Sequence, residues 1–300
     1  MIYDIIIVGA GPAGLTAAIY ALRSNKKVLV LEKETIGGQM SSSPLIENYP
    51  GFLSISGSEL ANNLYSQVIE LGGKVELEEV LSIEFGEVKT VTTDMGKYET
   101  KSIIFATGAK YRRLGLEKEE EFIGNGISFC VACDGAFYKD KTVAVIGGGN
   151  SAVINAITLS DICKKVYVVQ NLDKLSAEAS LINKLNAKEN AEVIYNATVQ
   201  ELIGDNNLSA ISIVVNKTEK RELAIDGIFV SIGLLPQNDF IKDDITLDEH
   251  GYIKSDTECT TNLEGVFVAG DCRTKNVRQI TTATADGSIA AINAVKYLNK

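Results

Sequence analysis

The sequence predicts an α/β fold made of two Rossmann-like (βαβ) domains, the second inserted into the first. Two observations lead to this prediction. Apolar segments typical of buried strands alternate with segments typical of helices, and a pattern of strand, glycine-rich turn and helix occurs twice. The segments expected to form strands are Asp4–Val8, Lys27–Leu31, Ser102–Ala106, Thr142–Ile146, Val166–Val169, Gly227–Ile232 and Gly265–Ala269.

The repeat defines the expected domains. Its first copy, IIIVGAGPAGLTAAIYAL, covers residues 5–22, and its second copy, VAVIGGGNSAVINAITL, covers residues 143–159. The tail returns to the first pattern with a strand that ends at Gly270 and Asp271. We therefore expect residues 1–110 and 238–300 to form one discontinuous domain, with residues 111–237 as the inserted domain.

Composition narrows the class of function. The 300 residues suffice for two domains, and the net charge of −10 disfavours a nucleic-acid partner or an anionic membrane surface. The uncharged run Ile5–Leu22 is long enough to span a membrane, but the glycines and proline in its middle favour a strand, a turn and a helix. The single histidine, His250, argues against a histidine metal centre or a Ser-His-Asp triad. Five cysteines, without a secretion signal, indicate the reducing cytoplasm.

The first glycine-rich turn, GAGPAG at residues 9–14, matches the dinucleotide-binding pattern G-x-G-x-x-G. Gly9 permits the tight turn, Gly11 leaves room for a pyrophosphate, and Gly14 lets the helix pack close to the strand. The free N–H groups at the start of the helix would face the phosphates. Glu32 ends the next strand, 18 residues after Gly14, and is placed to accept hydrogen bonds from a ribose.

The second turn, GGGNSA at residues 147–152, has Ala152 in place of the third glycine. The strand after it continues into Gln170, Asn171 and Leu172. The ribose-reading position therefore has neither the acid typical of NAD binding nor the arginine typical of NADP binding. The residues favour a nucleotide-type fold that no longer binds its nucleotide.

The segment CVACDG contains Cys130 and Cys133 at the spacing of a reducible disulfide that can exchange with another protein. A zinc site would need a second pair of ligands, and the other cysteines form none, so we expect no metal. Asp134 is placed to protonate a departing thiolate, although a turn or cap role would also suit it. We expect the remaining cysteines to be structural.

Together these segments resemble the low-molecular-weight thioredoxin reductases over nearly the whole chain. The resemblance also includes the segments GGQ at residues 37–39, ENYPG at 47–51, ATG at 106–108 and the tail at 270–283. It implies FAD in the discontinuous domain, a homodimer, and a Cys130 that attacks thioredoxin while Cys133 faces the flavin and Asp134 acts as the acid. The residues that the family pattern assigns to FAD are Gly9, Gly11, Pro12, Ala13, Gly14, Glu32, Gly38, Gln39, Asn48, Thr107, Gly108, Gly270, Asp271, Arg278, Gln279 and Ile280.

The chain departs from the NADPH-dependent members at the second turn. Their His-Arg-Arg…Arg run is absent, and Ile154 and Asn155 replace their glutamate pair. In this respect the sequence resembles the ferredoxin-linked flavin thioredoxin reductases of anaerobes. That resemblance implies reduced ferredoxin as the electron donor, with NADPH or NADH as the alternative. A flavin sensor without turnover is a third hypothesis, and the reactive CxxC segment argues against it.

No domain is basic overall, so a docking patch for an acidic ferredoxin would have to be local. The two candidate clusters, for which ordinary surface or cofactor contacts are the other interpretation, are Lys110, Arg112 and Arg113, and Arg273, Lys275 and Arg278.

Overall fold

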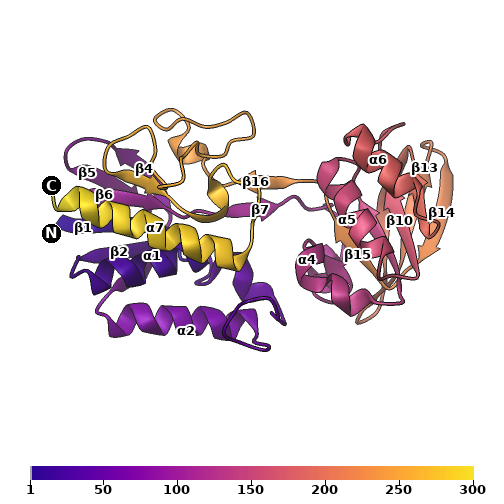
Figure 1. Ribbon diagram of the computed structural model, residues 1–300, viewed down its shortest axis with the longest axis horizontal. Coiled ribbons are helices and arrows are strands. Elements are labelled where there is room, and N and C mark those ends of the chain that lie inside the picture. The colour runs from indigo at the N-terminus through magenta and orange to yellow at the C-terminus, as the bar shows by residue number, and fades with distance from the viewer. Residues whose placement is uncertain (1) are drawn as a thin grey trace. The chain divides into compact units, whose positions relative to one another are not determined.

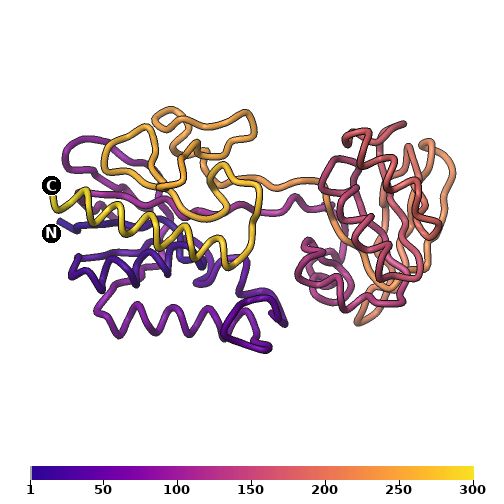
Figure 2. The backbone as a smooth tube through the Cα atoms, in the orientation of Figure 1, coloured from indigo at the N-terminus to yellow at the C-terminus, as the bar shows by residue number. Residues whose placement is uncertain are grey.

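The computed structural model describes residues 2–300, which divide into two compact units. Unit 1 combines the chain up to Lys110 with Leu235–Lys300, and unit 2 is Tyr111–Leu234. Figure 2 shows both the indigo and the yellow end of the chain in unit 1. The second boundary lies three residues before the expected 237. The chain crosses between the units in two short strands that pair with each other, β7 (Ala109–Tyr111) and β16 (Leu234–Pro236), so a boundary there is defined only to within a few residues.

Unit 1 is built on a seven-stranded sheet in the order β3-β2-β1-β6-β5-β4. Strand β17 pairs with the last residues of β6, beyond β5 and on the side away from β1. Strands β1, β2, β3, β6 and β17 run parallel, whereas β4 and β5 form an antiparallel meander with β6. Helix α7 lies alongside α1 (Figure 1). The elements are β1 (Ile2–Val8), α1 (Pro12–Arg23), β2 (Val28–Glu32), η1 (Gly38–Ser42), α2 (Gly57–Glu70), β3 (Lys74–Leu77), β4 (Val80–Glu84), β5 (Lys89–Thr93), β6 (Lys97–Phe105), η3 (Asp239–Ile241), β17 (Val266–Val268), η4 (Gly270–Cys272) and α7 (Ile280–Leu298).

The continuous apolar run of β1 is explained by burial on both faces of this sheet. Ile5 and Ile7 pack with the three long helices, while Ile6 and Val8 pack on the opposite face with residues of the meander and of the segment after residue 240. Because side chains alternate across a strand, only an unbroken apolar run can fill both layers. The same sheet brings the carboxyl ends of β1, β2 and β6 together.

Unit 2 repeats the plan with a five-stranded parallel sheet in the order β11-β10-β9-β15-β8. One face packs on the antiparallel sheet β12-β13-β14 and the other on α5 and α6. The elements are α3 (Glu119–Phe122), β8 (Ile127–Ser128), α4 (Val131–Asp134), η2 (Gly135–Tyr138), β9 (Thr142–Ile146), α5 (Asn150–Ser160), β10 (Lys165–Val169), α6 (Ala179–Asn186), β11 (Ala191–Ile194), β12 (Ala197–Gly204), β13 (Leu208–Val215), β14 (Glu219–Ala224) and β15 (Gly227–Val230).

The two repeat copies form the expected strand, turn and helix: β1 with α1, and β9 with α5. Within residues 2–300, no helix is both long and apolar enough to cross a membrane. The run Ile5–Leu22 forms most of β1, the glycine turn and most of α1. The described residues also contain no group of three or more His, Cys, Asp or Glu side chains placed to hold a metal ion.

Candidate functional site

The first glycine turn has the geometry that its three glycines predict. Gly9 has φ +108°, and a side chain there would overlap the carbonyl group of Ala106. A side chain at Gly14 would overlap the carbonyl oxygen of Gly9, so α1 packs directly against the turn. Gly11, by contrast, has open space on the side where a Cβ would point. Pro12 and Ala13 begin α1 behind it. The open space is therefore available to a ligand.

Glu32 holds this turn in place at the end of β2. Its Oε2 accepts a hydrogen bond from the N–H of Ala10 at 2.8 Å, and its Oε1 accepts one from the N–H of Glu34 at 2.9 Å. Glu32 also lines a cavity of about 220 Å³ together with Gly9 and Thr107. The carboxylate is thus fixed by the main chain at the edge of a ligand-sized space, as a ribose-reading residue requires.

Other predicted residues converge on the same region from distant parts of the chain. Gly38 starts η1 close to Gly11: a Cβ on Gly38 would lie 3.4 Å from the Gly11 Cα. The side chain of Asn48 donates to Gln279 Oε1 at 3.4 Å. Two further hydrogen bonds involve predicted residues: Gln39 Nε2 donates to the carbonyl oxygen of Ala109, and Thr107 Oγ1 donates to Asn238 Oδ1 at 3.0 Å. Gly108, which follows Thr107, has a positive φ.

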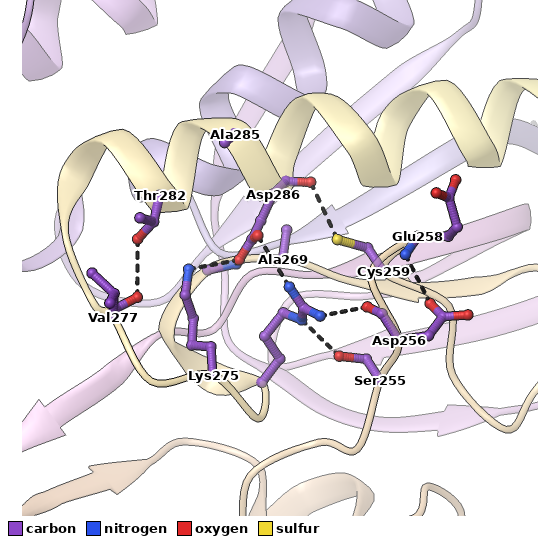
Figure 3. A network of polar contacts seen from close by, with 12 residues as sticks. Ser255, Asp256, Glu258, Cys259, Ala269, Lys275, Val277, Thr282, Ala285 and Asp286 are labelled. Carbon is purple, nitrogen blue, oxygen red and sulfur yellow. Dashed lines mark hydrogen bonds and ion pairs between the residues drawn. The ribbon is translucent and has the colours of Figure 1, made fainter.

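The tail after β17 is fixed by a buried polar network around Asp286 of α7 (Figure 3). Asp286 Oδ2 accepts hydrogen bonds from the N–H of Gly270 at 3.1 Å and from Lys275 Nζ at 2.8 Å. Its Oδ1 accepts one from Arg273 Nη1 at 3.0 Å. All three charged side chains are about nine-tenths buried. Gly270 has φ +80°, so the network anchors the tight turn that begins η4.

This network corrects one expectation. Arg273 and Lys275 were candidates for a docking patch, but both side chains are buried and paired with Asp286. Arg278, the third member, donates to the carbonyl oxygen of Asp271 at 3.4 Å, and its guanidinium lies 4.2 Å from the ring centre of Tyr252. The tail's cations therefore stabilise the turn instead of forming a basic surface.

Asp271 follows Gly270, and among residues 2–300 it has the one buried side-chain polar atom that lacks a hydrogen-bond partner. Its Oδ1 is buried and makes no hydrogen bond within the described chain. Burial raises the pKa of this carboxyl group. Gln279 and Ile280 begin α7 nearby in sequence, where Gln279 forms a capping box with Thr282. A buried acceptor without a donor is costly, so this oxygen is suited to a hydroxyl group of a ligand.

The redox segment of unit 2 contains a disulfide between Cys130 and Cys133, with Cα atoms 5.3 Å apart. Cys130 is the N-cap of α4, and its Sγ accepts the N–H of Cys133 at 3.2 Å. Both cysteines are partly exposed. Asp134 ends α4, and its Oδ2 accepts a hydrogen bond from the hydroxyl of Ser128 at 2.6 Å. The pair and the acid predicted from the sequence therefore occupy one short helix.

The three cysteines outside the redox segment are buried, whereas Cys130 and Cys133 are partly exposed. Burial raises the pKa of Asp134, and the hydrogen bond from Ser128 opposes that rise. Burial also raises the pKa of the Cys163 and Cys259 thiols to about 11 and that of Cys272 in the same direction. All three cysteines are free and buried, which fits the structural role expected for them.

The second glycine turn is covered by its own chain. Gln170 is 3% exposed, and its side chain fills the space beside Gly148, where a Cβ would overlap it. Ser176 folds back so that its N–H donates to the carbonyl oxygen of Gly148 at 2.9 Å. Glu178 is tied to Asn150, the first residue of α5, by hydrogen bonds of 2.8 and 3.2 Å. An acidic side chain thus lies where a phosphate group would approach the helix.

Sequence reasoning missed three residues that organise these sites: Asn238, Ser128 and Asp286. Asn238 is 1% exposed, and its Nδ2 donates to the carbonyl oxygens of Gly251 and Cys272. Ser128 precedes the redox pair by two residues, which was the only local signal for it. The partners of Asn238 and Asp286 lie mostly in loops. Loops have no hydrophobic periodicity, so the sequence does not predict where they lie.

Comparisons with known proteins agree with this geometry. Residues 3–287 match the model of the family described as pyridine nucleotide-disulphide oxidoreductase. The chain is 42% identical to the thioredoxin reductase of Listeria monocytogenes over 100% of this chain and 95% of the relative. A thioredoxin reductase structure from Streptococcus pyogenes matches with a TM-score of 0.95 and 41% identity, over 99% of this chain and 98% of the other. A ferredoxin-flavin thioredoxin reductase from Clostridium acetobutylicum matches with a TM-score of 0.54 and 30% identity, over 99% and 98%.

The residues of unit 1 fit the cofactor of these relatives. The open side of Gly11 and the N–H groups at the start of α1 suit a pyrophosphate, and the unsatisfied Oδ1 of Asp271 suits a hydroxyl group of the same molecule. Glu32 lies at the edge of the cavity that a ribose would enter. The chain belongs to the low-molecular-weight thioredoxin reductases, a branch of the pyridine nucleotide-disulphide oxidoreductases that binds FAD.

Proposed function

We propose that this protein reduces the disulfide of thioredoxin through Cys130 and Cys133, with electrons entering at FAD. The observation that supports this most directly is the redox segment. It joins a partly exposed disulfide to a half-buried acid whose pKa is raised, so that a proton donor lies beside the pair. When bound, FAD supplies the two electrons that convert the disulfide into a dithiol.

Cys130 is the nucleophile in this proposal because the N–H of Cys133 points at its sulfur and favours the thiolate. The thiolate attacks one sulfur of thioredoxin, which forms a mixed disulfide and releases the other sulfur as a thiolate. Asp134 protonates that leaving group. Cys133 then passes its proton to Asp134 and attacks Cys130. The second thioredoxin sulfur leaves and takes this proton, and the Cys130–Cys133 disulfide is restored.

The order of attack can be tested by trapping. Cys133→Ser removes the resolving thiol, so Cys130 should hold thioredoxin as a stable mixed disulfide. Cys130→Ser should trap nothing. Non-reducing electrophoresis followed by mass spectrometry identifies the linked cysteine. A covalent complex with Cys130→Ser, and none with Cys133→Ser, would reverse the two roles.

For the electron donor, the comparisons favour a pyridine nucleotide. The matching family model is named for pyridine nucleotides, and relatives at 41% and 42% identity are named thioredoxin reductase. The structure named for ferredoxin shares 30% identity, so the comparisons do not single out the ferredoxin-linked group. NADPH or NADH is accordingly the better supported donor at the level of the family.

A specific observation in unit 2 favours reduced ferredoxin as the second candidate. Gln170 fills the space beside Gly148, and exposed Asn171, Leu172 and Ser176 provide no cation for a 2′-phosphate. A ferredoxin delivers one electron at a time, and a flavin can collect two such electrons before a disulfide is reduced.

One experiment separates the donors. The oxidised flavoprotein is mixed without oxygen with NADPH, NADH or pre-reduced ferredoxin, and the flavin absorbance is followed before oxidised thioredoxin is added. Rapid bleaching by micromolar NADPH would establish the nucleotide donor. Bleaching by ferredoxin alone, followed by the appearance of thiols on thioredoxin, would establish ferredoxin. The homodimer and the cytoplasmic location expected from the sequence stay predictions, and light scattering tests the first.

A further inference from the structure

Ser128 connects the acid and the redox pair of unit 2. It ends β8, is 5% exposed, and its main chain is held by pairing with Phe229 of β15. Its Oγ lies 2.6 Å from Asp134 Oδ2 and accepts the N–H of Cys130 at 3.1 Å. One hydroxyl group on the parallel sheet therefore contacts both the first cysteine and the acid.

The direction of these hydrogen bonds follows from the chemistry of the hydroxyl group. A serine has a single hydrogen to donate. The carbonyl oxygen of Cys130 is 3.5 Å away, whereas Asp134 Oδ2 is 2.6 Å away, so the hydrogen points at the carboxylate. The N–H of Cys130 uses one of the lone pairs of the same oxygen. The hydroxyl group thus donates to the acid and accepts from the main chain of the first cysteine.

We infer that Ser128 is a positioning residue for thioredoxin reduction: it fixes the Asp134 carboxyl group relative to Cys130 and stabilises its ionised form between proton transfers. The inference rests on the proposed function, in which Asp134 donates a proton to the leaving thiolate. The acid must lose a proton and regain one in each cycle. Burial alone favours its protonated state. A hydrogen bond donated to the carboxylate opposes this effect, because it stabilises the ionised state.

Few other ionisable groups face Asp134. Cys130 and Cys133 are on its own helix. Tyr138 of η2 has a pKa raised to about 12 by burial and by the charges of Asp134 and Asp226, so it stays neutral in the working range. Leu159 of α5 and Ile162, which follows that helix, face Gly135 with apolar side chains.

The first experiment measures thiol transfer without any electron donor partner. The holoenzyme is reduced with dithionite, mixed with excess oxidised thioredoxin, and quenched with acid so that thioredoxin thiols are counted against time and pH. The rate should fall as the pH rises through the pKa of Asp134, because the protonated acid is required. In Ser128→Ala this fall should move to higher pH by about one to two units, the size expected when a charged acceptor loses its donor.

Two variants serve as controls. Ser160→Ala removes another buried serine of unit 2, whose hydroxyl donates to the carbonyl oxygen of Ala156, and it should keep the wild-type profile. Ser128→Thr keeps the hydroxyl group and should restore the profile. A wild-type profile in Ser128→Ala, or the same shift in Ser160→Ala, would overturn the inference.

A second readout is independent of turnover. The ¹³C carboxyl signal of Asp134, assigned with Asp134→Asn, can be titrated in the oxidised protein. Ser128→Ala should raise the pKa read from this signal, and an unchanged pKa would refute the contact. Asp134→Asn should slow thiol transfer by about 10²–10⁴-fold. A wild-type rate in Asp134→Asn would refute the proposed acid, while the ¹³C titration would still test the role of Ser128.

Discussion

Gly11 and Gly14 belong to one turn but meet different neighbours, and this difference can be measured. Gly11 has open space and extended main-chain angles that other residues adopt, so Gly11→Val should fold and lose FAD because its side chain enters the pyrophosphate path. Gly14→Ala places a methyl group against the carbonyl oxygen of Gly9, and this overlap should lower the free energy of unfolding by about 1–3 kcal/mol.

The measurements are the flavin absorbance per chain and the urea midpoint of the flavin-free proteins. Ala17→Gly, at a buried position of the same helix that is not assigned to the cofactor, serves as a control that adds no side-chain atoms. Full flavin content in Gly11→Val would contradict the assignment of this turn to the cofactor.

Of the five thiols of the reduced protein, two should react with an alkylating agent and three should not. With pKa values of about 11, Cys163 and Cys259 are thiolates only to about one part in a thousand at pH 8, and Cys272 is buried completely. After reduction, brief alkylation of the folded protein at pH 8 should label Cys130 and Cys133 alone. Peptide mapping reads the sites, and all five should react in urea. Labelling of Cys259 or Cys272 in the folded state would show that unit 1 opens in that region.

We expect the segment between β10 and α6 to limit how tightly the second turn can bind a phosphorylated nucleotide. Replacing Asn171, Leu172 and Ser176 by arginine adds three cations at exposed positions. Two new charge-assisted contacts to a 2′-phosphate would tighten NADPH binding by about 10²–10⁴-fold relative to the natural chain. Titration calorimetry measures the change.

A matched variant with glutamine at the same three positions adds length without charge and should bind NADPH as the natural chain does. NADH, which lacks the 2′-phosphate, should gain much less. Equal gains for NADPH and NADH would mean that the segment does not read the phosphate.

Burial explains the strands that the sequence predicted and some of those that it did not, although the largely buried β13 was also missed. Each of the seven predicted segments overlaps a largely buried strand of a parallel sheet, such as β1 or β9, and such strands have apolar sequences. Strands β12 and β14 of the antiparallel sheet of unit 2 were missed, since most of their residues are exposed or only partly buried. Short motifs located Cys130 and Gly11, but Thr107 meets Asn238 across 131 residues, and no local pattern predicts such a contact.

At the scale of the whole molecule, the two units have separate hydrophobic cores. One pair of apolar clusters lies within unit 1 and another pair within unit 2. We therefore expect two unfolding transitions in calorimetry of the flavin-free protein. FAD at a hundred times its dissociation constant adds about 2.7 kcal/mol to the unit that binds it. It should raise only the unit 1 transition, by about 5–10 °C.

Adenosine diphosphate at saturation serves as a control, since it resembles one half of FAD and should raise the same transition by less. A single transition that moves as a whole would mean that the two cores unfold together.

The path of the chain through unit 1 also sets the order in which the protein is made. Strand β6 is synthesised early, but its neighbour β17 begins only at Val266, after the whole of unit 2. Domains tend to fold as they emerge from the ribosome, so unit 2 can close while the sheet of unit 1 still has an open edge. The oxygen of Asp271 and helix α7 emerge last. We therefore expect flavin capture to follow the end of synthesis, because Asp271 and α7 complete unit 1 last.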